Sequence, residues 1–334
     1  MKKIILTLTV LLLAFTLFAG GSKEAADGAA GAVKIGLIVE NTIDDKGWCQ
    51  SMYDGLVQAK EELGDRMEFS YTEKVSTVDA GTYIRQFVAE GYDLIIAHGA
   101  QYKNAILEVA EEYPDVAFAF GTSSEIGPDN VFTYMPESEE TGYLSGIIAG
   151  MMTKSGKVGM VGPVDSGDAA RYMRGYIMGV ESVNPNAQVS TTLSGSFSDY
   201  VKAGEIATTL IANGCDVLTG ASQQAIGALN ATASTDALWV GQDLAQLDTA
   251  EGQAKCLAAS AYNYKAVVIG LVESLENGVK GGQCIPMNFN NGGFIFGYND
   301  ALDVPAEVKA KVEQALDEFT ASSGVLADYA SVEL

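Results

Sequence analysis

The chain has 334 residues, and its 43 Asp and Glu against 20 Lys and Arg give a formal net charge of −23. A surface of this sign repels phosphate backbones and anionic headgroups, so nucleic acid is a poor candidate partner. One His and four Cys are too few for a zinc protein rich in these residues. With 48% hydrophobic and 19% charged residues, the chain can bury a sizeable core, and its length suggests two domains or one large one.

The N-terminal segment has the pattern of a secretory signal peptide. Lys2 and Lys3 precede an apolar run over residues 4–18, which is shorter than the ~20 residues of a membrane-spanning helix. Residues 1–19 are therefore predicted to be a cleaved signal peptide, with an uncleaved membrane anchor as the alternative. Gly20 stands where a lipid-anchored protein would carry Cys, so a lipid anchor is not supported. We expect a periplasmic or other extracytoplasmic protein, with residues 20–32 as a flexible tether.

After that tether, short apolar runs alternate with stretches of helical spacing. Residues 33–40 read VKIGLIVE, and helical periodicity follows over residues 48–63. Nearly continuous apolar strands separated by helices are typical of parallel sheets that helices cover on both faces. We therefore predict an α/β protein with two doubly wound, Rossmann-like lobes. Further predicted strands are Met67–Val75, Leu94–Ala97, Val116–Phe120, Val131–Met135, Lys157–Val161, Gln188–Leu193, Asp216–Leu218, Leu238–Val240 and Lys255–Ser260.

The two lobes are predicted to share the chain through a hinge with several crossings. Residues 33–136 and about 258–288 are assigned to the first lobe, and residues 137–257 and about 289–334 to the second. No Pro- or Ser-rich linker marks the boundary. In open α/β sheets, ligands bind at the carboxyl ends of the strands, so the crevice between the lobes is the predicted ligand site.

Polar loops that follow the predicted strands supply candidate ligand contacts. Trp48 lies beside acidic and amide side chains after the first strand, and Phe197 occupies the equivalent turn of the second lobe. One aromatic side chain from each lobe can clamp a flat ring. Stacking contributes roughly 1–3 kcal/mol per base and accepts any π face, so hydrogen bonds to the ring edge must supply discrimination. The alternative for Trp48 is packing into the hinge as part of the core.

The order of several motifs resembles the basic membrane lipoprotein family, also called PnrA-like. Residues 44–55, DDKGWCQSMYDG, resemble the DDKSFNQ signature of this family. Residues 143–162, YLSGIIAGMMTKSGKVGMVG, are similar to its YLAG and SKTGKIGFVGG segments, and residues 195–220 and 240–246 complete an ordered set. The family comprises receptors for purine nucleosides or purine bases that work with ABC importers. The resemblance implies a fold like that of type I periplasmic binding proteins.

The resemblance implies capture of a small molecule rather than catalysis. It predicts a monomeric, extracytoplasmic binding protein that holds a purine nucleoside or base between two lobes, needs no cofactor and delivers its ligand to an ABC permease in the membrane. A sugar or signal-molecule receptor on the same scaffold is the alternative. A secreted nucleosidase would need a pair of acids in a defined loop, and the sequence offers no adequate pair.

The resemblance also implies ligand contacts at individual positions. Trp48 replaces the stacking Phe of the family, and Cys49 replaces the Asn that follows it. Gln101 or Asn104 replaces an acidic reader of the base, and Asp243 matches the Asp that holds ribose hydroxyls in nucleoside-binding members. The complete set of predicted ligand contacts is Asp45, Trp48, Cys49, Gln101, Tyr102, Asn104, Phe197, Gln223, Asp243 and Asn263.

Three other features have simpler interpretations. Residues 158–167 combine a strand, glycines and a helix start but lack G-x-G-x-x-G, so a dinucleotide site is not supported. His98 has no second His for a metal site, and we expect it to form hydrogen bonds or pack. Asp44 and Asp45 are expected to cap the following helix rather than act as an acid and base.

The four cysteines would lie in an oxidising compartment, where they allow three complete pairings. A bridge between Cys256 and Cys284 is the leading prediction, because one strand and one helix separate them. Cys215, at the start of an apolar strand, is expected to be a buried small residue. Cys49 would then remain a free thiol in the site.

Overall fold

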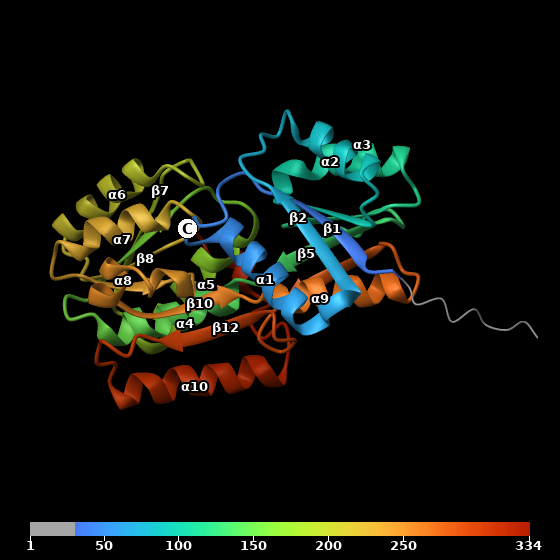
Figure 1. Ribbon diagram of the computed structural model, residues 1–334. Coiled ribbons are helices and arrows are strands. Elements are labelled where there is room, and N and C mark those ends of the chain that lie inside the picture. Colours follow the sequence, from blue (N-terminus) through green and yellow to red (C-terminus); the bar gives the residue numbers. More distant parts are fainter. Residues whose placement is uncertain (1–30) are drawn as a thin grey trace, which may run out of the picture. The chain divides into compact units, whose positions relative to one another are not determined.

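The computed structural model describes residues 31–334, so the predicted signal peptide and residues 20–30 of the predicted tether lie outside the described residues. Residues Ala32–Leu334 form one compact unit that contains two six-stranded sheets, each with helices on both faces (Figure 1). The predicted α/β architecture with two lobes is therefore confirmed. Within the described part of the chain, no helix combines the length and the apolar character needed to span a membrane.

The first lobe is built on a sheet in which all strands are parallel, in the order β11-β5-β4-β3-β1-β2. Helices α1 and α9 pack on one face of this sheet, and α2 and α3 pack on the other. Because both faces are covered, β3 (LIIAH) is buried along its whole length. The elements are β1 (Val33–Ile38), α1 (Trp48–Leu63), β2 (Met67–Thr72), α2 (Ala80–Ala89), β3 (Leu94–His98), α3 (Lys103–Glu112), β4 (Ala117–Gly121), β5 (Val131–Pro136), α9 (Tyr264–Glu276) and β11 (Gln283–Met287).

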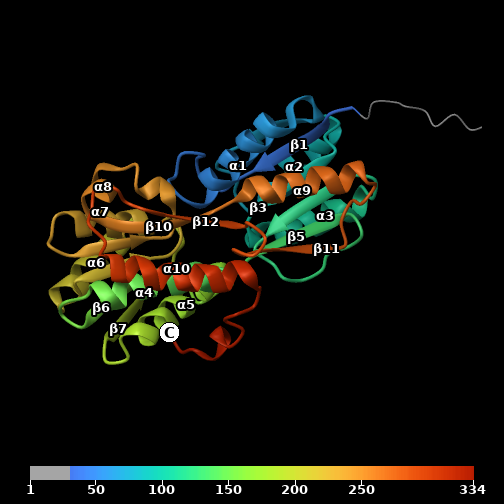
Figure 2. The ribbon, with the colours of Figure 1, turned by 90° about the horizontal axis from the view of Figure 1, so that it is seen from below.

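The second lobe contains the sheet β12-β10-β9-β8-β6-β7, in which only the β10–β12 pair among these strands is antiparallel. Helices α4, α5 and α10 pack on one face, and α6 and α7 on the other (Figure 2). The elements are α4 (Glu139–Met152), β6 (Lys157–Gly162), α5 (Gly167–Val183), β7 (Gln188–Leu193), α6 (Tyr200–Ala212), β8 (Val217–Gly220), α7 (Ala225–Ala233), β9 (Leu238–Gly241), α8 (Ala250–Lys255), β10 (Cys256–Tyr262), β12 (Phe294–Tyr298) and α10 (Ala306–Ala321).

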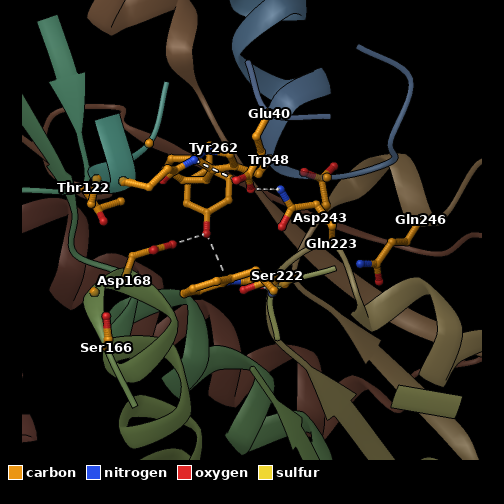
Figure 3. A pocket seen from close by; sticks show the side chains of 17 residues that line it. Glu40, Trp48, Thr122, Ser166, Asp168, Ser222, Gln223, Asp243, Gln246 and Tyr262 are labelled. Atoms are coloured by element: carbon orange, nitrogen blue, oxygen red, sulfur yellow. Dashed lines mark hydrogen bonds between the residues drawn. The ribbon is translucent and has the colours of Figure 1, made fainter. Parts of the chain in front are cut away.

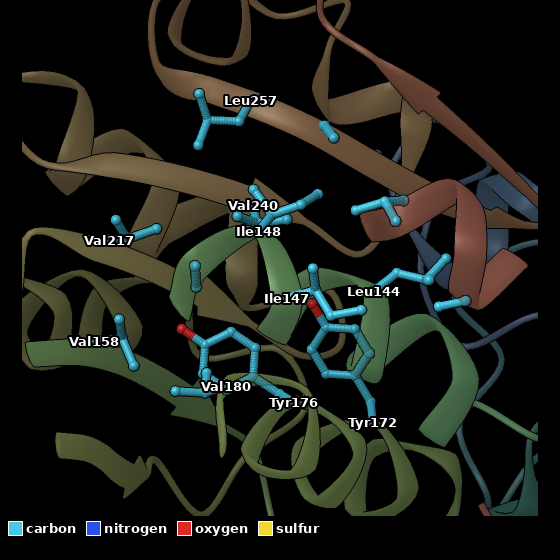
Figure 4. Packing of buried hydrophobic residues seen from close by; sticks show 14 of the residues in the cluster. Leu144, Ile147, Ile148, Val158, Tyr172, Tyr176, Val180, Val217, Val240 and Leu257 are labelled. Carbon is cyan, nitrogen blue, oxygen red and sulfur yellow. The ribbon is translucent and has the colours of Figure 1, made fainter. Parts of the chain in front are cut away.

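Helices α4 and α5 approach each other at backbone contact because glycines line their interface. A Cβ atom at Gly146 would lie 2.2 Å from the carbonyl oxygen of Tyr176, and one at Gly179 would lie 2.1 Å from that of Tyr143. Around this contact, buried aliphatic and tyrosine side chains fill the space beneath the sheet (Figure 4). This close packing fixes α5 against α4.

The chain crosses between the two sheets three times. It leaves the first sheet after Pro136, returns after Tyr262, and crosses again between Met287 and Phe294. The predicted boundary near residue 258 is wrong, because β10 pairs with β9 and with β12 as far as Tyr262 and thus belongs wholly to the second sheet.

The predicted disulfide bridge is also wrong, since all four cysteines are free. Cys256 is buried in β10 of the second sheet, whereas Cys284 lies in β11 of the first. The prediction rested on the single strand and helix that separate the two cysteines in sequence, and the crossing after Tyr262 places these cysteines in different sheets. Cys215 is buried, as predicted.

Candidate functional site

A cavity of about 330 Å³ lies between the carboxyl ends of the two sets of strands. This volume is near the lower end of the range for small-molecule sites. Among residues 31–334, no Lys, Arg or His lines the cavity, and no group of three or more His, Cys, Asp or Glu is arranged to hold a metal ion. The lining includes the carboxyl groups of Glu40, Asp168 and Asp243, the amides of Gln101, Gln223, Gln242 and Gln246, and the aromatic rings of Trp48, Phe197 and Tyr262.

The start of α1 places Trp48 at the cavity. The carboxylate of Asp45 accepts hydrogen bonds from the backbone N–H groups of Gly47 (3.0 Å), Cys49 (3.2 Å) and Gln50 (3.0 Å). These donors have no partner within the helix, so Asp45 stabilises its first turn. The predicted capping role of Asp45 is therefore confirmed, and Asp45 itself does not line the cavity.

His98 holds the indole of Trp48 in a defined orientation. The two rings stack with centroids 4.2 Å apart, and the indole N–H donates to the His98 carbonyl at 3.3 Å. His98 Nε2 lies 3.0 Å from the Trp48 carbonyl, and Nδ1 lies 2.7 Å from the Tyr134 hydroxyl. Because a carbonyl only accepts, Nε2 carries the proton and Nδ1 accepts from Tyr134. Burial lowers the pKa of His98 to about 3, so the ring is neutral and its predicted packing role is confirmed.

Glu40 connects the two lobes across the cavity. Its carboxylate accepts from the amide of Gln101 at 2.8 Å and from that of Gln223, in the second lobe, at 3.4 Å. Partial desolvation raises the pKa of Glu40 although the residue is exposed, and the two amide hydrogen bonds counteract this rise. The neighbouring Asn41 donates to the Tyr200 hydroxyl of the second lobe at 3.0 Å. The two lobes are thus in direct polar contact along this side of the cavity.

A second polar network runs beneath the cavity (Figure 3). The hydroxyl of Tyr262 donates to Asp168 at 2.7 Å and accepts from the amide of Gln242 at 3.0 Å. The carbonyl oxygen of Gln242 in turn accepts from the backbone N–H of Ser222 at 2.7 Å. Desolvation raises the pKa of Asp168, and the hydrogen bond from Tyr262 opposes it. Tyr262 ends β10, so this network joins the cavity to a hinge crossing.

Asp243 is the one carboxyl of the lining that retains a buried oxygen without a partner. Its Oδ1 accepts from the backbone N–H of Ala245 at 2.9 Å, whereas Oδ2 has no hydrogen-bond partner in a side chain that is 7% exposed. Burial, with smaller contributions from Asp45, Asp54 and Asp248, raises its pKa to about 8. A buried polar oxygen without a partner is costly, and a ligand hydroxyl that forms a hydrogen bond with Oδ2 would remove this cost.

Only part of the predicted set of contacts meets at the cavity. Trp48, Gln101, Phe197, Gln223 and Asp243 line it. They come from loops after different strands of both lobes, as the predicted crevice requires.

The other predicted contacts lie elsewhere. Cys49 is buried in the first-lobe core, because the residue after Trp48 points to a different face of the helix. Tyr102 is buried and donates to the Val75 carbonyl at 2.6 Å. Asn104 is exposed on α3, and the amide of Asn263 donates to the Gly292 carbonyl at 2.8 Å at a hinge crossing. None of these four lines the cavity, so their prediction as ligand contacts is corrected.

The sequence interpretation also missed several lining residues. Glu40 follows β1, Asp168 lies in the first turn of α5 after β6, and Tyr262 ends β10. These residues lie at or after the ends of strands, and a position of this kind is also what identified Trp48 as a candidate.

Comparisons with known proteins agree with this architecture. Residues 32–318 match the profile of the family described as ABC transporter substrate-binding protein PnrA-like. The nucleoside-binding protein BmpA of an ABC transporter from Lactococcus lactis subsp. cremoris is 27% identical over 338 residues, which cover 94% of this chain and 95% of that protein. The CD4+ T-cell-stimulating antigen of Listeria innocua is 33% identical over 181 residues, 53% of this chain. The chain spans about half the length of this Listeria relative (50%).

A solved structure shows the same fold. The solute-binding protein of an ABC transporter system from Conexibacter woesei superimposes with a TM-score of 0.71 at 25% sequence identity. The alignment covers 91% of this chain and 98% of that one.

Proposed function

The chain belongs to the PnrA-like family of ABC transporter substrate-binding proteins, and we propose that it captures a purine nucleoside or purine base outside the cytoplasm for delivery to a membrane permease. The observation that carries this proposal is a cavity lined by aromatic side chains from both lobes, Trp48 and Phe197. The printed name of the Lactococcus relative, a nucleoside-binding protein, supports the same ligand class.

The aromatic side chains account for binding of a planar ring. Trp48 is held by His98 before a ligand arrives, so little conformational entropy is lost when a base stacks on it. Phe197, from the second lobe, lines the same cavity and is 41% exposed, so it can offer its ring to the base as well. Each stacking contact contributes about 1–3 kcal/mol.

The acidic side chains account for binding of hydroxyl and N–H groups. Asp243 Oδ2 is buried, has no partner and lines the cavity. A ribose hydroxyl, which can donate and accept, would give this buried oxygen a hydrogen-bond partner. The absence of Lys, Arg and His from the lining, within residues 31–334, disfavours phosphorylated ligands.

Capture follows from contacts that exist only when the lobes are together. Gln223 and Tyr200 of the second lobe bond to Glu40 and Asn41 of the first. A ligand that touches Trp48 and Asp243 adds further contacts between the lobes and stabilises the closed form. We expect the protein to act as a monomer and to present this closed form to the permease without chemical turnover.

Two measurements on the purified protein test the proposal. Unfolding followed by mass spectrometry identifies any small molecule carried through purification. Calorimetric titration of the emptied protein with guanosine, inosine, adenosine, guanine and glucose then compares ligand classes. We expect saturable binding of at least one purine and none of glucose. Binding of glucose without any purine would establish the sugar-receptor alternative instead.

A further inference from the structure

Carboxyl and amide oxygens are prominent in the lining of the cavity. Three carboxyl groups line it, and within the described residues no cationic side chain does. Gln101 and Gln223 both direct an amide nitrogen to Glu40, which leaves their carbonyl oxygens as additional acceptors. Gln242 is already bonded through both its oxygen and its nitrogen. A ligand edge rich in N–H donors therefore fits this lining better than an edge rich in acceptors.

We propose that Glu40 is the residue that selects the base, by accepting hydrogen bonds from adjacent N–H groups on the ring edge. Among nucleosides, the site then prefers guanosine to inosine and inosine to adenosine. This inference rests on the proposed function, since it assigns a specificity within the purine class.

The preference follows from the donor pattern of each base. Guanine presents the N1–H and the 2-amino group side by side, and a carboxylate accepts both through its two oxygens. Hypoxanthine presents only the N1–H. Adenine places its amino group beside a ring-nitrogen acceptor, a pattern that suits the paired donor and acceptor of an amide. A carboxylate would set an oxygen lone pair against that ring nitrogen, and the contact would be repulsive.

The surroundings of Glu40 hold its two oxygens in place. Gln101 approaches Oε2 at 2.8 Å from the same lobe, and Gln223 approaches Oε1 at 3.4 Å from the other lobe. Because one of these donors comes from each lobe, Glu40 is fully oriented only when the lobes are together. Recognition of the base edge by Glu40 is thereby coupled to closure of the two lobes.

Calorimetric titration of the full chain with guanosine, inosine and adenosine tests the assignment. The parent protein should bind guanosine at least about tenfold more tightly than adenosine, in line with the discrimination that a paired hydrogen bond supplies. Glu40→Gln should weaken guanosine binding by about tenfold or more. It should also reduce or reverse the preference for guanosine over adenosine. Glu40→Asp, which keeps the carboxylate, should retain the order of preference.

Glu61→Gln is the matched control, because it makes the same charge change at an exposed position of α1 away from the cavity. It should leave all three affinities unchanged. Equal affinity of the parent for guanosine and adenosine, or an equal loss of both in Glu40→Gln, would overturn the role of Glu40 while leaving purine capture intact. Failure of every purine to bind would overturn both the inference and the proposed function.

Discussion

The two walls of the cavity differ in how completely the protein satisfies its own groups. On the first-lobe wall, Trp48 is stacked on His98 and hydrogen-bonded to it, and His98 is hydrogen-bonded in turn to Tyr134. On the second-lobe wall, Asp243 has a buried oxygen without a partner and Phe197 is 41% exposed. The side chains of the first wall thus have their partners within the folded protein. On the second wall, a ligand would provide the missing hydrogen bond to Asp243 and cover the exposed ring of Phe197.

The largest effect should come from breaking the support of the first wall. His98→Ala removes a buried ring and leaves the Tyr134 hydroxyl without its acceptor, so we expect the free energy of unfolding to fall by about 2–5 kcal/mol. Urea unfolding at pH 7 measures this loss. Phe197→Ala on the second wall is the control and should change stability by less than about 0.5 kcal/mol. Similar losses in both variants would mean that the walls do not differ in this way.

The two aromatic side chains should also differ in binding. Trp48→Ala is expected to weaken purine binding at least tenfold, about 1.4 kcal/mol, because a fixed stacking surface is lost. Phe197→Ala should cost about two- to threefold, since part of its stacking energy is spent on ordering an exposed side chain. Calorimetry with the best purine ligand compares the two. An unchanged affinity in Trp48→Ala would remove the indole from the site.

Asp243→Asn tests the unpartnered carboxyl of the second wall through the pH dependence of the unfolding free energy. The pKa of Asp243 is about 8 in the folded protein and about 3.9 in an unfolded chain. The folded state therefore binds more protons between these values, and the parent loses stability as pH rises from about 4 to about 8. Asp243→Asn lacks this titration. The unfolding free energy of the variant relative to the parent should therefore rise over that pH window by about 1 kcal/mol or more, and should stay constant above it.

Thermal or urea unfolding of both proteins at pH 4, 6, 8 and 9 measures this difference. A constant difference between the two proteins across the window would contradict the raised pKa of Asp243. Ligand binding by the variant should be weaker as well, because the amide nitrogen cannot accept from a ligand hydroxyl.

The smallest effect is expected at the polar contact between the lobes. Tyr200→Phe removes the hydrogen bond from Asn41, which is worth about 0.5 kcal/mol at an exposed site, and ligand affinity should fall by about twofold. Tyr113→Phe, at a similarly exposed tyrosine of the first lobe, controls for loss of a hydroxyl. Equal affinities of the two variants would show that the contact does not contribute to closure.

Much of the fold was predictable, because buried parallel strands require continuous apolar runs. β3 and β4 are buried at every position, and their sequences show no polar alternation. The end of β10 was not predictable from this pattern. Its apolar residues suit either sheet, and only pairing with β9 and β12 assigns Tyr262 to the second lobe.

The sequence predicted which loops form the candidate site, but it did not predict which side chains of those loops line the cavity. The sequence by itself determined that the loops after the strands meet at one edge, and that Trp48 lies in the first of them, because parallel strands end on the same side of a sheet. The tertiary structure decided that Trp48 faces the cavity and Cys49 the core, that Glu40 and Asp168 join the lining, and that Cys256 and Cys284 do not form a bridge. Side-chain direction and strand pairing depend on contacts between segments distant in the sequence, and no local pattern contains them.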